Sequence, residues 1–194
     1  MKAHERVTAA IRAANKAGRT GLVPFVTAGY PEPKEFIGTL KSVAAVGDVV
    51  EVGIPFSDPM ADGMTIQRSS FEALRKGVSL AWIFDELEKA GGFDAPLVMM
   101  SYLNPLLAFG YERLADRALE TGVCGFIVPD LPFEESAEIR SVLEEKGLGL
   151  IQLVTPATPD ARLKTLCDAS RGFVYAVTIT GITGGDVGLP SDLA

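Results

Sequence analysis

Apolar and polar positions along the chain fall into two alternating patterns. Six short runs are almost continuously apolar, and longer stretches with apolar residues at helical spacing lie between them. Short, nearly continuous apolar runs are typical of strands that are buried on both faces, as in parallel sheets. The expected strands are 22–27, 49–54, 97–101, 125–128, 149–154 and 173–177.

The helical segments complete a regular alternation of strand and helix. An amphipathic helix is expected over 5–16, before the first strand. The later helices are expected at 35–45, 65–75, 80–90, 111–121, 134–146 and 160–169. Because no linker or low-complexity segment interrupts this alternation, we predict a single α/β domain. Periodicity leaves open whether the sheet is doubly wound or a barrel, although no G-x-G-x-x-G sequence follows the first strand.

Composition narrows the classes of partner. The chain has 194 residues, 47% of them apolar, and a formal net charge of -7. This charge disfavours a nucleic-acid partner, but a local nest of backbone N–H groups can still bind an anionic small substrate. Cys124 and Cys167 form neither a disulfide framework nor a metal-ligand spacing. With no signal peptide and no apolar run of membrane-spanning length, we expect a cytoplasmic protein that does not enter a membrane.

The histidine content restricts the chemistry further. The single histidine, His4, is expected to be a solvated residue of the first helix. A Ser–His–Asp hydrolase, a Cys–His protease and a histidine-ligated zinc site would each lack a key residue. Acid–base chemistry must therefore come from carboxylates, tyrosine, lysine or cysteine.

Glu51 is the most anomalous residue, because it lies inside an apolar run that should be buried. A buried carboxylate costs several kcal/mol unless it is paired or protonated. An ion pair with a neighbouring strand and a role at the carboxyl end of a barrel strand are equally compatible with this position. Asp58 and Asp62, in the following loop, have turn formation or helix capping as their commoner role. Tyr175, in the last strand, is equally compatible with core packing.

Several motifs, taken together, carry a family resemblance. They are PFVTAGYP at 24–31, EVGIPFSDPMADG at 51–63, TIQ at 65–67, SYLNP at 101–105, PDLPFEES at 129–136, and Thr183-Gly184. In this order and spacing they resemble the tryptophan synthase alpha family. Met64 departs from the pattern, because the family commonly has proline there.

The resemblance implies a TIM-type (β/α)8 barrel and a lyase. The family cleaves indole-3-glycerol phosphate to indole and glyceraldehyde 3-phosphate by a retro-aldol reaction in tryptophan biosynthesis, without a metal or organic cofactor. Glu51 matches the catalytic glutamate, which serves as an acid–base group. Asp62 matches the aspartate that accepts the indole N–H and stabilises developing positive charge. The expected substrate-contacting residues are Phe25, Tyr175, Thr183 and Gly184.

The resemblance also implies a partner, a PLP-dependent beta subunit that receives the indole. Asp58, Asn104 and Pro132 match positions near that docking surface. An alternative is an interaction subunit or fragment that binds and activates the beta subunit, or self-associates, without catalysis of its own. A related indole-glycerol-phosphate synthase barrel would use lysine and glutamate at strand ends, and the absence of lysine from the six expected strands argues against it.

The family continues through a seventh and an eighth strand, whose loops contact the phosphate. We therefore expect residues 1–194 to form one barrel domain that is truncated after about six βα units, without the two C-terminal ones. Such a barrel has open edges, so we expect self-association, or flattening into a doubly wound sheet, and negligible lyase activity of this chain alone.

Overall fold

A computed structural model describes residues 1–177 of the chain. Within them, one parallel sheet follows the order β1-β2-β3-β4-β5-β6. The strands are β1 Phe25–Thr27, β2 Val50–Gly53, β3 Leu97–Met100, β4 Val123–Ile127, β5 Gly149–Val154 and β6 Val174–Ala176. All six expected strands are therefore present, with ends that differ by a few residues.

The helices lie between the strands, as the alternating pattern predicted. They are α1 Ala3–Lys16, α2 Phe36–Ala44, α3 Met64–Arg75, α4 Leu80–Ala90, α5 Leu103–Phe109, α6 Tyr111–Glu120, α7 Ala137–Glu145 and α8 Asp160–Ala169. Short 3-10 turns at Pro33–Glu35 and Phe133–Glu135 precede α2 and α7. No helix in the described part of the chain is long and apolar enough to cross a membrane.

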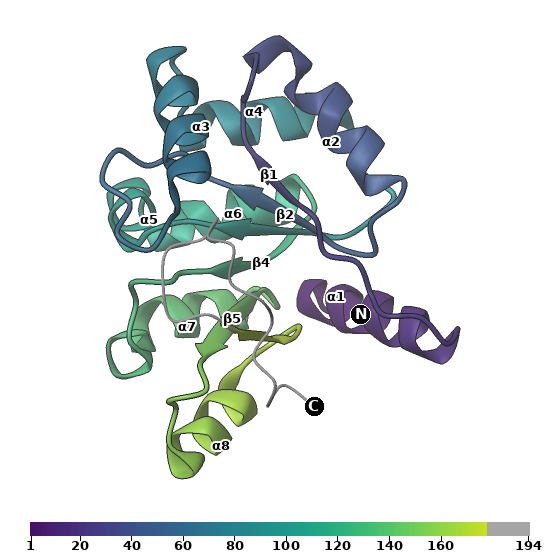
Figure 1. Ribbon diagram of the computed structural model, residues 1–194, viewed down its shortest axis with the longest axis vertical. Helices are drawn as coiled ribbons and strands as arrows, with labels where there is room; N and C mark the ends of the chain where they lie inside the picture. Colours follow the sequence, from purple (N-terminus) through teal and green to yellow (C-terminus); the bar gives the residue numbers. More distant parts are fainter. Residues whose placement is uncertain (178–194) are drawn as a thin grey trace.

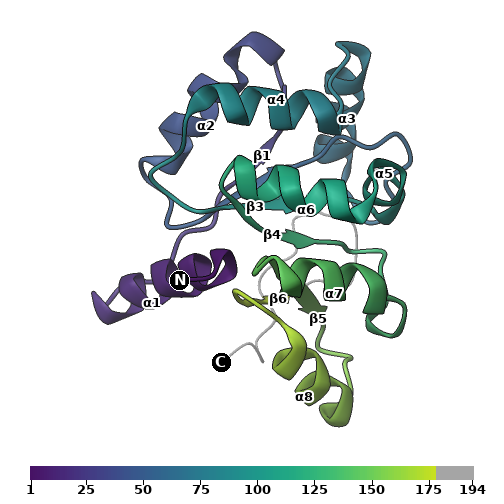
Figure 2. The same cartoon turned by 180° about the vertical axis from the view of Figure 1, so that it is seen from behind.

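The strand order decides between the two α/β architectures. Each strand pairs with the next one in the sequence, so the sheet winds in one direction only. A doubly wound sheet would instead reverse its order at a switch point. Figures 1 and 2 show α2, α4, α6, α7 and α8 following one another around the outside of the curled sheet. The described residues thus form a half-barrel of the TIM type, and the sheet has not flattened.

The larger core lies between the outer face of the sheet and these helices. Alternate strand residues, such as Val50 and Val52, point outward into it. It is closely filled by large apolar side chains that are almost completely buried. The largest are Phe36, Phe84, Phe126, Leu40, Ile83 and Leu87.

A second core lies on the inner face, where α1 covers the end of the sheet at which the strands begin. Val7 of α1 packs there with Val49, Val98 and Ile151. The Thr8 hydroxyl donates a hydrogen bond to the Gly172 carbonyl at 2.7 Å. Helix α1 therefore closes one end of the half-barrel and leaves the other end for the loops that follow the strands.

His4 differs from its predicted environment. It is half-buried rather than solvated, because its backbone N–H donates to the Gly147 carbonyl and its Cβ lies near Gly149 of β5. Burial is the main cause that lowers the pKa of its imidazole.

Gly125 faces Gly149 across β4 and β5, and a Cβ at Gly125 would lie 2.6 Å from the Gly149 carbonyl oxygen. The missing side chain at Gly125 thus lets the backbones of β4 and β5 approach closely, and the one at Gly149 leaves room for His4 of α1.

The first strand and helix α5 differ locally from what the sequence pattern predicted. The first strand begins at Phe25 instead of 22, and Leu22 is 52% exposed, although its carbonyl still accepts hydrogen bonds from the backbone of Asp48 and Val49. Helix α5 was not predicted, since it is short and contains Pro105. Proline is tolerated in the first turn of a helix, where its missing N–H has no intrahelical partner.

Candidate active site

Glu51 lies in the middle of β2 and faces the inside of the half-barrel. Its neighbours Val50 and Val52 point into the outer core, so period-two alternation turns Glu51 to the inner face. Only 4% of the residue is exposed. In the parallel ladder it stands between Phe25 of β1 and Val98 of β3.

The Glu51 carboxyl is buried without a compensating cation. None of the ion pairs formed within residues 1–177 includes it, so the ion-pair explanation for this residue does not apply. Burial raises its pKa from 4.5 to about 7, and the negative charge of Asp62 adds to this effect. A carboxyl with a pKa near neutrality can both donate and accept a proton at physiological pH.

Asp62 lies in the loop between β2 and α3 and is half-buried. Burial raises the pKa of its carboxyl, while a hydrogen bond from the Tyr102 hydroxyl lowers it. The backbone around it is held at two points. The Gln67 side-chain amide donates to the Asp62 carbonyl at 2.8 Å, and the Ala61 N–H donates to the Tyr102 hydroxyl at 2.9 Å.

Two aromatic residues named from the sequence border the same inner surface. Phe25 is 36% exposed, and its ring occupies the space over Gly53, where an added Cβ would lie 2.2 Å from the ring. Burial is the main cause that raises the pKa of Tyr175, followed by the charges of Glu51 and then Asp62. The structure therefore brings Phe25 beside Glu51, and places Tyr175 on the same inner face, where the charges of both acids raise its pKa. Thr183 and Gly184 lie outside the described residues.

Tyr102 was missed as a functional residue by sequence reasoning. It is the residue that precedes α5, is 5% exposed, and stacks its ring on Phe56 with centroids 5.0 Å apart. The sequence contained it only as part of a matched segment. An aromatic side chain with a hydroxyl at the end of a barrel strand was the available signal, but its contact with the Asp62 loop depends on the fold.

The three residues assigned to docking are exposed at the end of the half-barrel where the strands terminate. Asp58, Asn104 and Pro132 follow β2, β3 and β4, which are adjacent in the sheet. The segments are tied together, because the Leu103 N–H donates to the Asp130 carboxylate at 2.9 Å. This arrangement places the three residues on the same end as Glu51 and Asp62.

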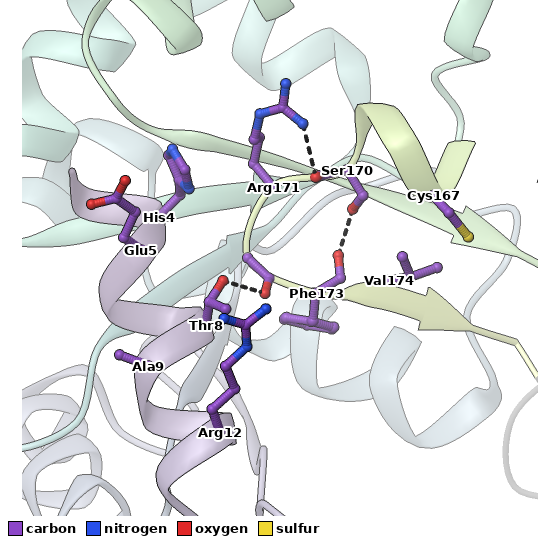
Figure 3. A pocket seen from close by; sticks show the side chains of 11 residues that line it. His4, Glu5, Thr8, Ala9, Arg12, Cys167, Ser170, Arg171, Phe173 and Val174 are labelled. Carbon is purple, nitrogen blue, oxygen red and sulfur yellow. Dashed lines mark hydrogen bonds between the residues drawn. The ribbon is translucent and has the colours of Figure 1, made fainter. Parts of the chain in front are cut away.

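A separate cavity of about 640 Å³ lies at the opposite end, between α1 and the segment that enters β6 (Figure 3). Several of its polar groups bond to one another. The Ser170 hydroxyl donates to the Phe173 carbonyl, and the Arg171 guanidinium donates to the Ser170 carbonyl at 3.1 Å. In TIM-type barrels this end generally serves stability and the other end catalysis. We therefore place the candidate active site at Glu51 and Asp62.

Candidate metal ligands do not gather at this site. Within residues 1–177, no group of three or more histidine, cysteine, aspartate or glutamate residues could hold a metal ion. The groups that this surface offers for chemistry are the carboxyls of Glu51 and Asp62 and the aromatic residues beside them.

Comparison with known proteins identifies a family. The family model described as tryptophan synthase alpha chain matches residues 11–194. The tryptophan synthase alpha chain of Nitratidesulfovibrio vulgaris is 44% identical over 191 residues, which cover 97% of this chain and 74% of the relative. The protein of the same name from Desulfovibrio desulfuricans is 49% identical over 181 residues, covering 91% and 71%.

Solved structures with the same fold have related sequences. Tryptophan synthase from Mycobacterium tuberculosis superposes with a TM-score of 0.85 at 34% identity, covering 92% of this chain and 70% of that one. The subunit alpha from Legionella pneumophila gives 0.83 at 32%, covering 91% and 68%. A chain of the Pyrococcus furiosus complex gives 0.76 at 37%, covering 80% and 65%.

The raised pKa of Glu51 predicts a specific pH dependence of stability. Below its unfolded pKa of 4.5 the group is protonated in both states. As the pH rises toward 7, the unfolded chain loses this proton first, so the folded state loses stability. The full penalty, about 3 kcal/mol, is reached above the folded pKa. Glu51→Gln should therefore stabilise the protein relative to wild type increasingly between about pH 4 and about pH 8.

Denaturant unfolding of both proteins at several pH values measures this difference. Glu35→Gln, which removes an exposed carboxyl near α2, is the control and should follow the wild-type pH dependence. A constant difference between Glu51→Gln and wild type across this range would show that Glu51 ionises as readily in the folded protein as in the unfolded chain.

Proposed function

Because the chain belongs to the tryptophan synthase alpha chain family, we propose that Glu51 and Asp62 carry out the cleavage of indole-3-glycerol phosphate, the family's lyase reaction in tryptophan biosynthesis. The observation that supports this assignment is the burial of Glu51 on the inner face, without a cation and beside Asp62. The proposal treats residues 1–194 as part of a single barrel domain.

The retro-aldol reaction needs two proton transfers. The bond from the side chain to indole C3 breaks readily only after C3 has been protonated. A proton must also leave the side-chain hydroxyl as the aldehyde forms. Glu51, whose pKa is about 7, can give the proton to C3 and is suited to take up the proton of the hydroxyl. The products are indole and glyceraldehyde 3-phosphate, and no cofactor is consumed.

Asp62 acts on the charge that this protonation creates. Protonation at C3 places positive charge on the ring, and the indole N–H becomes a stronger donor. A carboxylate that accepts this N–H stabilises the charged intermediate more than the neutral substrate. Glu51 and Asp62 come from one strand and its loop, so a single rigid element sets their separation.

The inner-face aromatics suit the substrate as well. Phe25, which pairs with Glu51 in the ladder, and Tyr175, on the inner face of β6, offer apolar surface for an indole ring. Thr183 and Gly184 complete the proposed substrate contacts by their match to the family motif. We propose that the phosphate of the substrate is bound elsewhere on the barrel, since the surface around Glu51 and Asp62 is acidic.

Substitution of the two acids tests the assignment in a full-length alpha chain that carries these residues. Glu51→Gln should lower kcat by about 10² or more, because an amide cannot transfer the proton. Asp62→Asn should lower kcat more than it raises KM, because its contact strengthens as charge develops.

Release of indole from indole-3-glycerol phosphate measures both effects, with Glu35→Gln as the control. A Glu51→Gln enzyme that kept more than about a tenth of the wild-type rate would assign Glu51 a structural role. An Asp62→Asn enzyme with a raised KM and an unchanged kcat would make Asp62 a ground-state binding residue.

We also propose that this chain docks a beta subunit through the end of the half-barrel that carries Asp58, Asn104 and Pro132. The related Pyrococcus furiosus protein belongs to an α2β2 complex. Exposed apolar side chains support a protein contact near this end, since Met60 is 80% exposed and Leu107 of α5 is 56% exposed. Asp58, Asn104 and Pro132 would then lie within the contact.

Charged substitutions on this surface should separate docking from catalysis. Asn104→Lys or Pro132→Lys should weaken activation by the beta subunit, because a bulky charge would be buried in the contact. The basal lyase rate should be retained. Ala9→Lys, exposed on α1 at the opposite end, is the matched control. Titration of the lyase rate with beta subunit measures activation, and an equal loss of basal and activated rates would place the two residues in the active site.

We further propose that a polypeptide of these 194 residues, produced alone, self-associates and has a negligible lyase rate. Among the described strands, β1 pairs only with β2, and β6 pairs only with β5. Unpaired strand edges offer N–H and C=O groups to a second copy. Light scattering should therefore report a mass above 20.6 kDa, and no indole release should be detected. A monodisperse monomer that turned over rapidly would contradict both statements.

A further inference from the structure

Tyr102 and the adjacent Leu103 connect three segments that follow neighbouring strands. The Tyr102 backbone lies just after β3, where it precedes α5. Its hydroxyl accepts the Ala61 N–H at 2.9 Å, in the loop after β2, and hydrogen bonding by the same hydroxyl lowers the pKa of the adjacent Asp62. The adjacent Leu103 N–H is held by Asp130, which follows β4. A single buried side chain thus bridges the scaffold and the loop that carries Asp62.

The hydrogen-bond capacity of a phenol makes this bridge directional. A tyrosine hydroxyl has one proton to donate and oxygen lone pairs to accept with. Because the Ala61 N–H already uses the oxygen as an acceptor, the one proton is available to Asp62. A charged carboxylate is the stronger acceptor for that proton. The Ala61 contact and the ring stack on Phe56 therefore hold the loop that carries Asp62, and the hydroxyl favours the charged form of the Asp62 carboxyl.

The ring prevents the hydroxyl from moving. Tyr102 is 5% exposed and stacks on Phe56, with centroids 5.0 Å apart and planes inclined by 26°. Phe56 belongs to the same loop as Asp62, so the ring and the hydroxyl hold this loop at two separate points. Asp130 holds the backbone on the other side. These contacts leave the phenol little rotamer freedom, as expected of a side chain that orients a neighbour.

We propose that Tyr102 is a positioning residue of the lyase, which holds the Asp62 carboxylate against the indole-binding surface beside Glu51. This inference rests on the proposed function of Asp62. It adds a residue that touches neither reacting atom in the proposed mechanism, and whose effect passes through Asp62.

The effect should extend to Glu51 through charge. The ionisable groups that face Asp62 are Glu51 from β2, Tyr102 from the end of β3, and Tyr175 from β6. The negative charge of Asp62 raises the pKa of Glu51, because it opposes the ionisation of Glu51. When Asp62 is protonated, this charge is absent and the opposition is removed. Loss of the Tyr102 hydroxyl should thus raise the pKa of Asp62 and weaken its contribution to the raised pKa of Glu51.

The experiment is a pH titration of side-chain carboxyl signals by NMR, on the 194-residue chain labelled at aspartate and glutamate carboxyl carbons. Tyr102→Phe keeps the ring and its stack on Phe56 but removes the hydroxyl. We expect a higher Asp62 pKa than in wild type, and amide exchange at Ala61 faster by about tenfold, which corresponds to one lost hydrogen bond. Tyr111→Phe, which removes a hydroxyl from the outer core, is the control and should change neither.

A reciprocal measurement covers the case in which Tyr102→Phe fails to fold. The Asp62 charge and the hydrogen bond to Asp62 both raise the pKa of Tyr102, after the larger effect of burial. Asp62→Asn should therefore lower the pKa of Tyr102, as followed by ultraviolet absorbance of the phenolate. An Asp62 pKa that is unchanged in Tyr102→Phe, or a Tyr102 pKa that is unchanged in Asp62→Asn, would overturn the proposal.

Kinetics in a full-length alpha chain separate this inference from the proposed function. Tyr102→Phe should lower kcat with little change in KM and displace the acidic limb of the pH–rate profile. If Asp62 shifts its pKa in Tyr102→Phe while Asp62→Asn retains full lyase activity, Tyr102 positions Asp62 but Asp62 has no catalytic role. If Asp62→Asn is inactive while Tyr102→Phe shows neither shift, the proposed function stands and the positioning role fails.

Discussion

Burial of the Glu51 carboxyl beside Asp62 is the constraint on which the rest of the site depends. Two acids approach each other on the inner face without an intervening cation, and the cost appears as the raised pKa of Glu51. Such an arrangement persists only when the surroundings leave the side chains no alternative position. Strand β2 restricts the position of Glu51 in this way, because Val50 and Val52 on either side of it are packed into the outer core.

The two ends of the half-barrel divide the tasks of stability and chemistry. At the end where the strands begin, α1 packs on Val49 and Val98, and the facing pair Gly125 and Gly149 allows the backbones to approach closely. At the other end the loops after β2, β3 and β4 are connected by the bonds of Tyr102 and Asp130. Packing at one end thus holds the strands in place, and hydrogen bonds at the other end hold the loop that carries Asp62.

Much of the fold could be predicted from the sequence because its causes are local. Apolar runs and helical spacing located all six strands, and α4 and α8 have the bounds that periodicity predicted. Helix α5 escaped because it has only seven residues and contains Pro105, so it lacks the repeated apolar spacing of a longer helix. The choice between a barrel and a doubly wound sheet needed the strand order, which periodicity does not contain.

The candidate site could be predicted where a residue interrupts its local pattern or belongs to a family motif. Glu51 is conspicuous because a carboxylate interrupts an apolar strand, whereas Asp62, whose commoner role in its loop is turn formation or helix capping, was assigned to the site by the family resemblance. Tyr102 gives no comparable signal, because an aromatic residue after a strand is ordinary. Its importance arises from contact across 41 residues of chain with the Ala61 N–H, and from its bond to Asp62. Glu51 and Asp62 lie in one strand and its loop, so they are close together in the sequence. The residues that hold this strand and loop in place come from other segments and meet them only in the folded protein.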